Sequence, residues 1–153
     1  MSSSPVGSVV PANSIPEVVS NSRSQSRLRL AAGMVAGAGA AVLINTGIGQ
    51  AARAIGVSPS FPYLTPQVYL PATAVMALLA GLGWVIIWRR TRRPARLLRV
   101  LVPALLVVSF VPDLLVALTA APGTNDALGF AALMSMHAVI AGSVSLAMSR
   151  VSR

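Results

Sequence analysis

Two ionisable residues, Asp113 and His137, lie within long apolar stretches of the chain. A carboxylate and an imidazole are the usual parts of a membrane proton relay, and they can equally form a structural pair between helices. A charge near the centre of a bilayer costs about 2.5–3.5 kcal/mol on insertion scales, so both residues should face the interior of a helix bundle. The pair predicts either a site for a proton, a cation or a polar ligand, or a contact that only holds helices in register.

Other polar residues fall at a similar depth in the apolar stretches. Pro112 removes a backbone donor directly before Asp113, which tends to kink a helix and to expose a carbonyl oxygen. Ser109 lies one helical turn before Asp113 on the same face. The sequence therefore predicts one intramembrane polar layer with members from four helices: Asn45, Thr46, Thr73, Ser109, Asp113, Ser135 and His137.

Catalytic chemistry is not indicated by these residues. Asp113, His137 and a serine such as Ser135 or Ser143 supply the residue types of a nucleophilic triad, but no G-x-S-x-G motif accompanies them. No second histidine or carboxylate lies inside the apolar stretches to complete a metal site. The chain has no cysteine, which excludes disulfides and thiolate ligands. We therefore expect no enzyme activity, no cofactor and no metal.

Four apolar helices must position these residues. The chain has 153 residues, of which 55% are apolar and 10% charged, whereas an average soluble domain has about 25% charged residues. The apolar runs match the ~20 residues that a helix needs to cross a bilayer core. We predict an all-α fold, an integral membrane four-helix bundle, with spans at about residues 28–49, 68–88, 97–118 and 127–148.

The segments outside the spans are rich in serine, proline and glycine. Residues 1–27 show no apolar period and predict a disordered Ser/Pro-rich tail, which leaves 28–150 as the transmembrane domain. The proline-rich residues 56–66 predict an interfacial loop, and residues 121–126 a turn in which Asp126 caps the fourth helix. The first span also resembles a cleaved signal sequence, but its long polar leader favours an uncleaved helix.

Arginines are distributed unevenly between the two sides of the predicted bundle. Eleven of the twelve lie in the N-terminal tail, in the connector between spans two and three, and at the C-terminus, whereas Arg53 alone lies on the other side. By the positive-inside rule, both termini are expected to be cytoplasmic and the other two loops external. This pattern determines topology, so we expect no nucleic-acid partner despite the net charge of +9. The absence of lysine and the high content of Ala, Gly and Val are typical of a bacterium with a high-GC genome. We therefore expect the protein to lie in a bacterial plasma membrane.

The connector between spans two and three carries a dense group of arginines. Arginines near a membrane surface attract anionic lipid head groups by about 1 kcal/mol each. The alternative is that they only stop translocation and fix the topology. The residues predicted to contact anionic lipid are Arg89, Arg90, Arg92, Arg93 and Arg96.

Small residues recur every four positions in the first span, at Gly33, Gly37 and Ala41. This spacing leaves one helix face nearly without side chains, so a neighbouring backbone can approach closely. The neighbour is expected to be another helix of the same bundle. Homodimerisation remains the alternative, since the spacing does not distinguish the two.

The chain resembles small four-helix membrane proteins of actinobacteria that form a domain family of unknown function. The resemblance covers about residues 28–150 and depends chiefly on Val111-Pro112-Asp113-Leu114 and Met136-His137-Ala138-Val139-Ile140-Ala141. It implies four spans and no particular activity. We therefore expect a multi-pass membrane protein of unestablished function, an accessory or interaction protein whose partners are the lipid bilayer and a second copy or another membrane protein. The alternative is a small transporter or proton/cation-coupled protein that uses Asp113 and His137.

Overall fold

The computed structural model describes residues 15–119 and 126–152, which form four α-helices and one short 3-10 turn. The helices are α1 (Ile15–Ala54), α2 (Pro66–Arg90), α3 (Pro94–Thr119) and α4 (Ala127–Val151), and the turn η1 (Pro62–Leu64) precedes α2. Each helix contains a segment long and apolar enough to cross a membrane. The prediction of an all-α membrane four-helix fold is confirmed.

Helix α1 begins earlier than the sequence indicated. Its first residue is Ile15, whereas the first span was predicted to begin at Leu28. No glycine or proline interrupts residues 17–32, so the helix can extend beyond the apolar span into the serine-rich segment. The candidate membrane span of α1 lies within Ser24–Ala54. Of the predicted tail, residues 1–14 lie outside the described residues.

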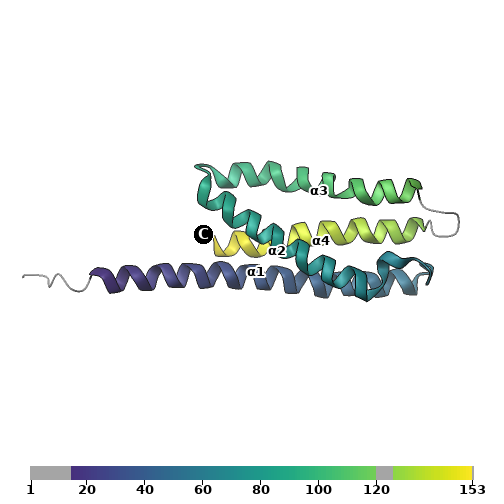
Figure 1. Ribbon diagram of the computed structural model, residues 1–153, viewed down its shortest axis with the longest axis horizontal. Helices are drawn as coiled ribbons and strands as arrows, with labels where there is room; N and C mark the ends of the chain where they lie inside the picture. Colours follow the sequence, from purple (N-terminus) through teal and green to yellow (C-terminus); the bar gives the residue numbers. More distant parts are fainter. Residues whose placement is uncertain (1–14, 120–125, 153) are drawn as a thin grey trace, which may run out of the picture.

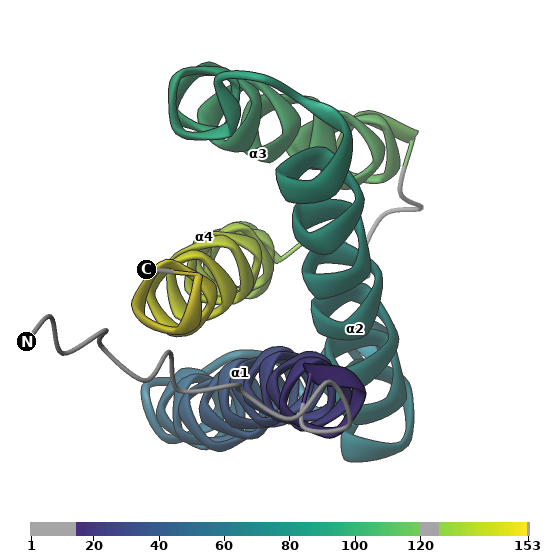
Figure 2. The ribbon, with the colours of Figure 1, turned by 90° about the vertical axis from the view of Figure 1, so that its left-hand side faces the viewer.

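The helices are not arranged as a symmetric square. Helices α1 and α4 lie side by side along most of the bundle, and α3 lies on the opposite side of α4 (Figure 1). Helix α2 crosses the bundle at an angle, from α1 at one end to α3 at the other (Figure 2). We call these the loop end, where α1 is followed by η1, and the arginine end, where α2 meets α3.

The glycines of α1 bring its backbone close to α4. A Cβ atom built on Gly37 would lie 3.1 Å from the Cα atom of Val144, and one built on Gly33 would lie 2.6 Å from a methyl group of Val151. Ala41, the next residue of this series, is fully buried. The small residues of α1 therefore face α4 of the same chain.

The loop after α1 folds back onto the bundle. Phe61 and Leu64 are fully buried, and the ring of Phe61 packs edge-on against Phe130 of α4, with centroids 5.1 Å apart. Gly129 makes room for this ring, because a Cβ atom there would lie 2.8 Å from it. The proline-rich loop predicted from sequence is thus part of a hydrophobic core rather than only an interfacial segment.

Two charged residues fix the loop in place. The guanidinium of Arg53 donates to the carbonyl oxygen of Leu64 over 2.9 Å and 3.3 Å. Asp126 accepts hydrogen bonds from the backbone N–H groups of Ser58 at 2.8 Å and Gly129 at 3.0 Å. Asp126 therefore caps α4, as predicted, and also connects the two segments at the loop end. These donors, Ser58 first, hold the pKa of Asp126 below its usual value of 3.8.

Candidate functional site

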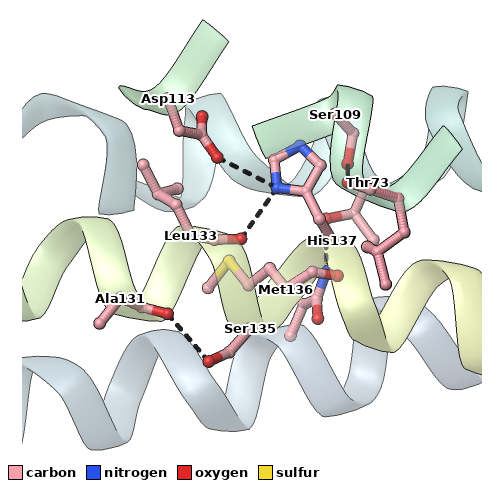
Figure 3. Close-up of polar contacts among 10 residues, drawn as sticks. Thr73, Ser109, Asp113, Ala131, Leu133, Ser135, Met136 and His137 are labelled. Carbon is pink, nitrogen blue, oxygen red and sulfur yellow. Dashed lines mark hydrogen bonds and ion pairs between the residues drawn. The ribbon is translucent and has the colours of Figure 1, made fainter. Parts of the chain in front are cut away.

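Asp113 of α3 and His137 of α4 lie next to each other (Figure 3). The Nδ1 atom of His137 is 3.3 Å from Oδ2 of Asp113, and the side chains are 24% and 16% exposed for His137 and Asp113. Nδ1 is also 2.9 Å from the carbonyl oxygen of Leu133, one turn earlier in α4. The imidazole ring stands edge-on to Phe110 of α3, with centroids 6.2 Å apart.

The pair can hold one proton in two ways. If Nδ1 of His137 carries the proton, it donates to the carbonyl oxygen of Leu133, which at 2.9 Å is closer than the Asp113 carboxylate at 3.3 Å. Oδ2 of Asp113 then has no hydrogen bond among the described residues. If Asp113 carries the proton, the carboxyl group can donate to an unprotonated Nδ1. The position of the proton therefore decides whether α4 bonds to itself or to α3.

A second polar site lies on another side of α4. Nδ2 of Asn45 donates to Oγ1 of Thr73 at 3.0 Å and to the carbonyl oxygen of Met136 at 3.4 Å. Asn45 is fully buried, Thr73 is 3% exposed, and the amide oxygen of Asn45 has no partner among the described residues. This contact joins α1, α2 and α4 in a sealed part of the core.

The single polar layer predicted from sequence is therefore corrected to two separate sites. Met136 and His137 are consecutive in α4 and face different neighbours: α1 and α2 for Met136, α3 for His137. Hydroxyl groups on a helix can bond to a carbonyl of the preceding turn, which removes the need for a partner on another helix. Three members of the predicted layer do this: Thr46 to Val42, Ser109 to Leu106 and Ser135 to Ala131.

A partly open cavity of about 550 Å³ lies between α2, α3 and α4. His137, Ser109 and Pro112 line it near the middle of the bundle, and Trp84, Ile87 and Leu98 line it toward the arginine end. Apart from the indole of Trp84, its polar side chains are Ser109, His137 and Ser145. Among the described residues of α3, only Leu98 is buried, so this helix leaves space beside α4.

This cavity is not evident from the amino-acid sequence. Residues 100–118 of α3 are apolar except for Ser109 and Asp113, so their pattern does not show which apolar face lacks a neighbour. One signal was available in α2, where Gly83 faces the cavity and nothing lies within 4 Å of a Cβ atom built on it.

The five arginines predicted to contact lipid are exposed at the arginine end. Arg89 and Arg90 end α2, Arg92 and Arg93 lie in the connection, and Arg96 is in the first turn of α3. Among the described residues, no three histidine, aspartate or glutamate side chains lie close enough together to hold a metal ion.

Residues 24–153 match DUF6069, a family of unknown function. The chain belongs to this family. The match covers α2, α3, α4 and α1 from residue 24 onward. The family description carries no activity that could be transferred to the two polar sites or to the cavity of the DUF6069 chain. Comparison with curated proteins and with solved structures finds no match.

Proposed function

We propose that this protein is a non-enzymatic accessory protein of the bacterial plasma membrane that accommodates an apolar chain of a membrane component between α2, α3 and α4. The observation that carries the proposal is the cavity of about 550 Å³, which falls within the 300–1,000 Å³ typical of ligand pockets. Its lining is almost entirely aliphatic, so an occupant must be apolar along most of its length.

The length of the cavity fits one leaflet of a bilayer. Its lining residues extend from Met76 to Ile87 in α2 and from Leu98 to Pro112 in α3, which is about 16 Å and about 21 Å along the two helices. The hydrocarbon core of a bilayer is about 30 Å thick, so one leaflet contributes about 15 Å. An acyl chain that enters from one surface would therefore end near His137 and Asp113.

The proposed orientation has both termini in the cytoplasm. The arginine distribution supports it, because eleven of twelve arginines belong to the tail, the α2–α3 connection or the C-terminus. The N-terminal part of α1, the α2–α3 connection and the C-terminal part of α4 lie toward the same end of the bundle (Figure 1). With this orientation, the cavity belongs to the cytoplasmic leaflet.

Proton-coupled or cation-coupled transport is the second candidate function. The observation in its favour is the position of His137 Nδ1, which is 2.9 Å from the Leu133 carbonyl oxygen and 3.3 Å from the Asp113 carboxylate. A transported ion also needs a polar path to both surfaces. The aliphatic lining of the cavity and the buried Phe61 and Leu64 at the loop end favour the accessory role instead.

Cross-linking from a labelled lipid tests the proposed function. The protein is placed in phosphatidylcholine vesicles that contain a phosphatidylcholine with a photoreactive acyl chain, and the cross-linked peptides are identified by mass spectrometry. We expect labelling of cavity residues such as Leu101 and Leu105, and loss of that labelling in Gly83→Phe, whose ring would occupy the cavity.

Gly39→Phe is the matched control. Gly39 is also a mid-helix glycine with nothing within 4 Å of a built Cβ atom, but it is exposed on α1 and does not line the cavity. The proposal would be contradicted if the label were spread equally over the cavity residues and outward-facing residues such as Leu43, and if Gly83→Phe did not change it.

A further inference from the structure

Two arginines, Arg90 of α2 and Arg99 of α3, lie beside the lining of the cavity near the arginine end. Arg90 follows Ile87 by three residues and Gly83 by seven, so it lies on the face of α2 that lines the cavity. Arg99 directly follows the lining residue Leu98 and precedes Val102 by three residues and Leu106 by seven, which places it beside the cavity face of α3.

Neither guanidinium is neutralised by a residue whose side chain the structure describes. Arg90 and Arg99 are exposed, and neither forms a hydrogen bond or an ion pair with the described residues. Asp113 and Asp126, the carboxylates whose side chains are described, are engaged toward the middle of the bundle and at the loop end. The arginine end of the cavity therefore combines an aliphatic lining with positive charge that has no partner among the described residues.

Aromatic residues locate the membrane surface at the same level. Trp84 and Trp88 of α2 are stacked, with ring planes 9° apart and centroids separated by 6.4 Å. The indole N–H of Trp84 donates to the hydroxyl oxygen of Ser152 at the end of α4. Tryptophans concentrate at the depth of the lipid head groups, and Arg90 follows Trp88 by two residues, so its long side chain can reach the phosphate level.

We propose that the occupant is an anionic glycerophospholipid of the arginine-bearing leaflet, with one acyl chain in the cavity and its phosphate between Arg90 and Arg99. This inference depends on the proposed function and names the ligand class of the same site. A guanidinium forms paired hydrogen bonds with phosphate, and the net charge of the head group decides between lipids with the same chains. The other arginines of the connector contribute only to the general surface potential.

The test compares two probes with the same photoreactive acyl chain, one a phosphatidylglycerol and the other a phosphatidylcholine, in phosphatidylcholine vesicles at low salt. For the wild-type chain we expect about 30-fold preferential labelling of the cavity by the anionic probe, which corresponds to about 1 kcal/mol for each of two arginines. Arg90→Gln/Arg99→Gln should reduce the preference to a few-fold.

Arg89→Gln/Arg96→Gln is the matched control. It removes the same charge from exposed residues of the same two helices, but Arg89 lies two residues after Ile87 and Arg96 two residues before Leu98, on other helix faces. We expect this control to keep most of the preference.

The possible outcomes separate this inference from the proposed function. Equal labelling by both probes, or an equal loss in the two double variants, would overturn the role of Arg90 and Arg99. If Gly83→Phe still abolished the labelling in that case, acyl-chain binding would stand without head-group selection. If neither probe labelled the cavity, both proposals would fail.

Discussion

Replacement of Gly37 by leucine tests whether α1 packs against α4 of its own chain. A Cβ atom at this position would lie 3.1 Å from Cα of Val144 and 3.3 Å from Cβ of Ala147. The first of these atoms belongs to the backbone, so the two helices must separate to admit any side chain. Overpacking of this kind typically costs about 1–3 kcal/mol.

The expected result is a lower thermal unfolding temperature for the purified protein in detergent. For a chain of this size, 1 kcal/mol corresponds to a shift of about 2–4 °C, so Gly37→Leu should lower the midpoint by about 2–12 °C. Gly33→Leu should have a smaller effect, because its nearest neighbour is a side-chain methyl of Val151 near the end of α4. Circular dichroism at 222 nm follows the transition, with detergent and protein concentration held constant.

Gly39→Leu controls for the effect of leucine on the helix itself. It is two residues away in the same helix and has nothing within 4 Å of a built Cβ atom, so it reports helix propensity without a clash. Equal midpoints for Gly37→Leu and Gly39→Leu would refute the packing argument. Loss of an oligomer without loss of stability would instead assign the glycine face to an interface between copies.

Three further predictions concern the polar residues and the topology. His137→Leu should lower the free energy of unfolding by about 1–3 kcal/mol, because it leaves the Asp113 carboxylate without its neighbour. Asp113→Leu should lower it less, since His137 keeps its contact with the Leu133 carbonyl oxygen. The opposite order of stability in thermal unfolding would contradict this prediction. Because the pKa of Asp126 is lowered in the folded state, its contribution to stability is fully present above its usual pKa of 3.8 and is lost as the pH falls through the lowered pKa. The wild type should therefore exceed Asp126→Leu in unfolding midpoint at pH 6, and the difference should shrink as the pH is lowered below 3.8. Reporter fusions after residue 153 and within 89–96 should be cytoplasmic and those within 57–66 external, and an external C-terminus would refute the orientation.

The sequence was sufficient to predict the helices, because hydropathy over about 20 residues is a property of each segment alone. The contact between Asp113 and His137 was also predictable from the sequence, since both are ionisable residues within apolar helices that follow one another in the chain. The internal bonding of Ser109 was not predictable, because its hydroxyl can bond either to its own helix or to a neighbour. The cavity depends on the angle at which α2 crosses the bundle, and that angle results from packing between distant residues such as Gly81 and Met34.

The buried position of Phe61 likewise depends on a distant residue. An aromatic side chain in a proline-rich loop is equally suited to the membrane surface and to a core. The space for the ring is provided by Gly129, which is far away in the sequence.

The most direct test of the cavity's role uses Trp84, which lines it and is 9% exposed. In a Trp88→Phe background it is the only tryptophan, and its fluorescence can be measured in vesicles of phosphatidylcholine with brominated acyl chains, which quench indoles on close contact. Acyl-chain entry predicts strong quenching that Gly83→Phe relieves and Gly39→Phe leaves unchanged. Quenching that is weak, or that is the same in all three proteins, would contradict acyl-chain binding between α2, α3 and α4.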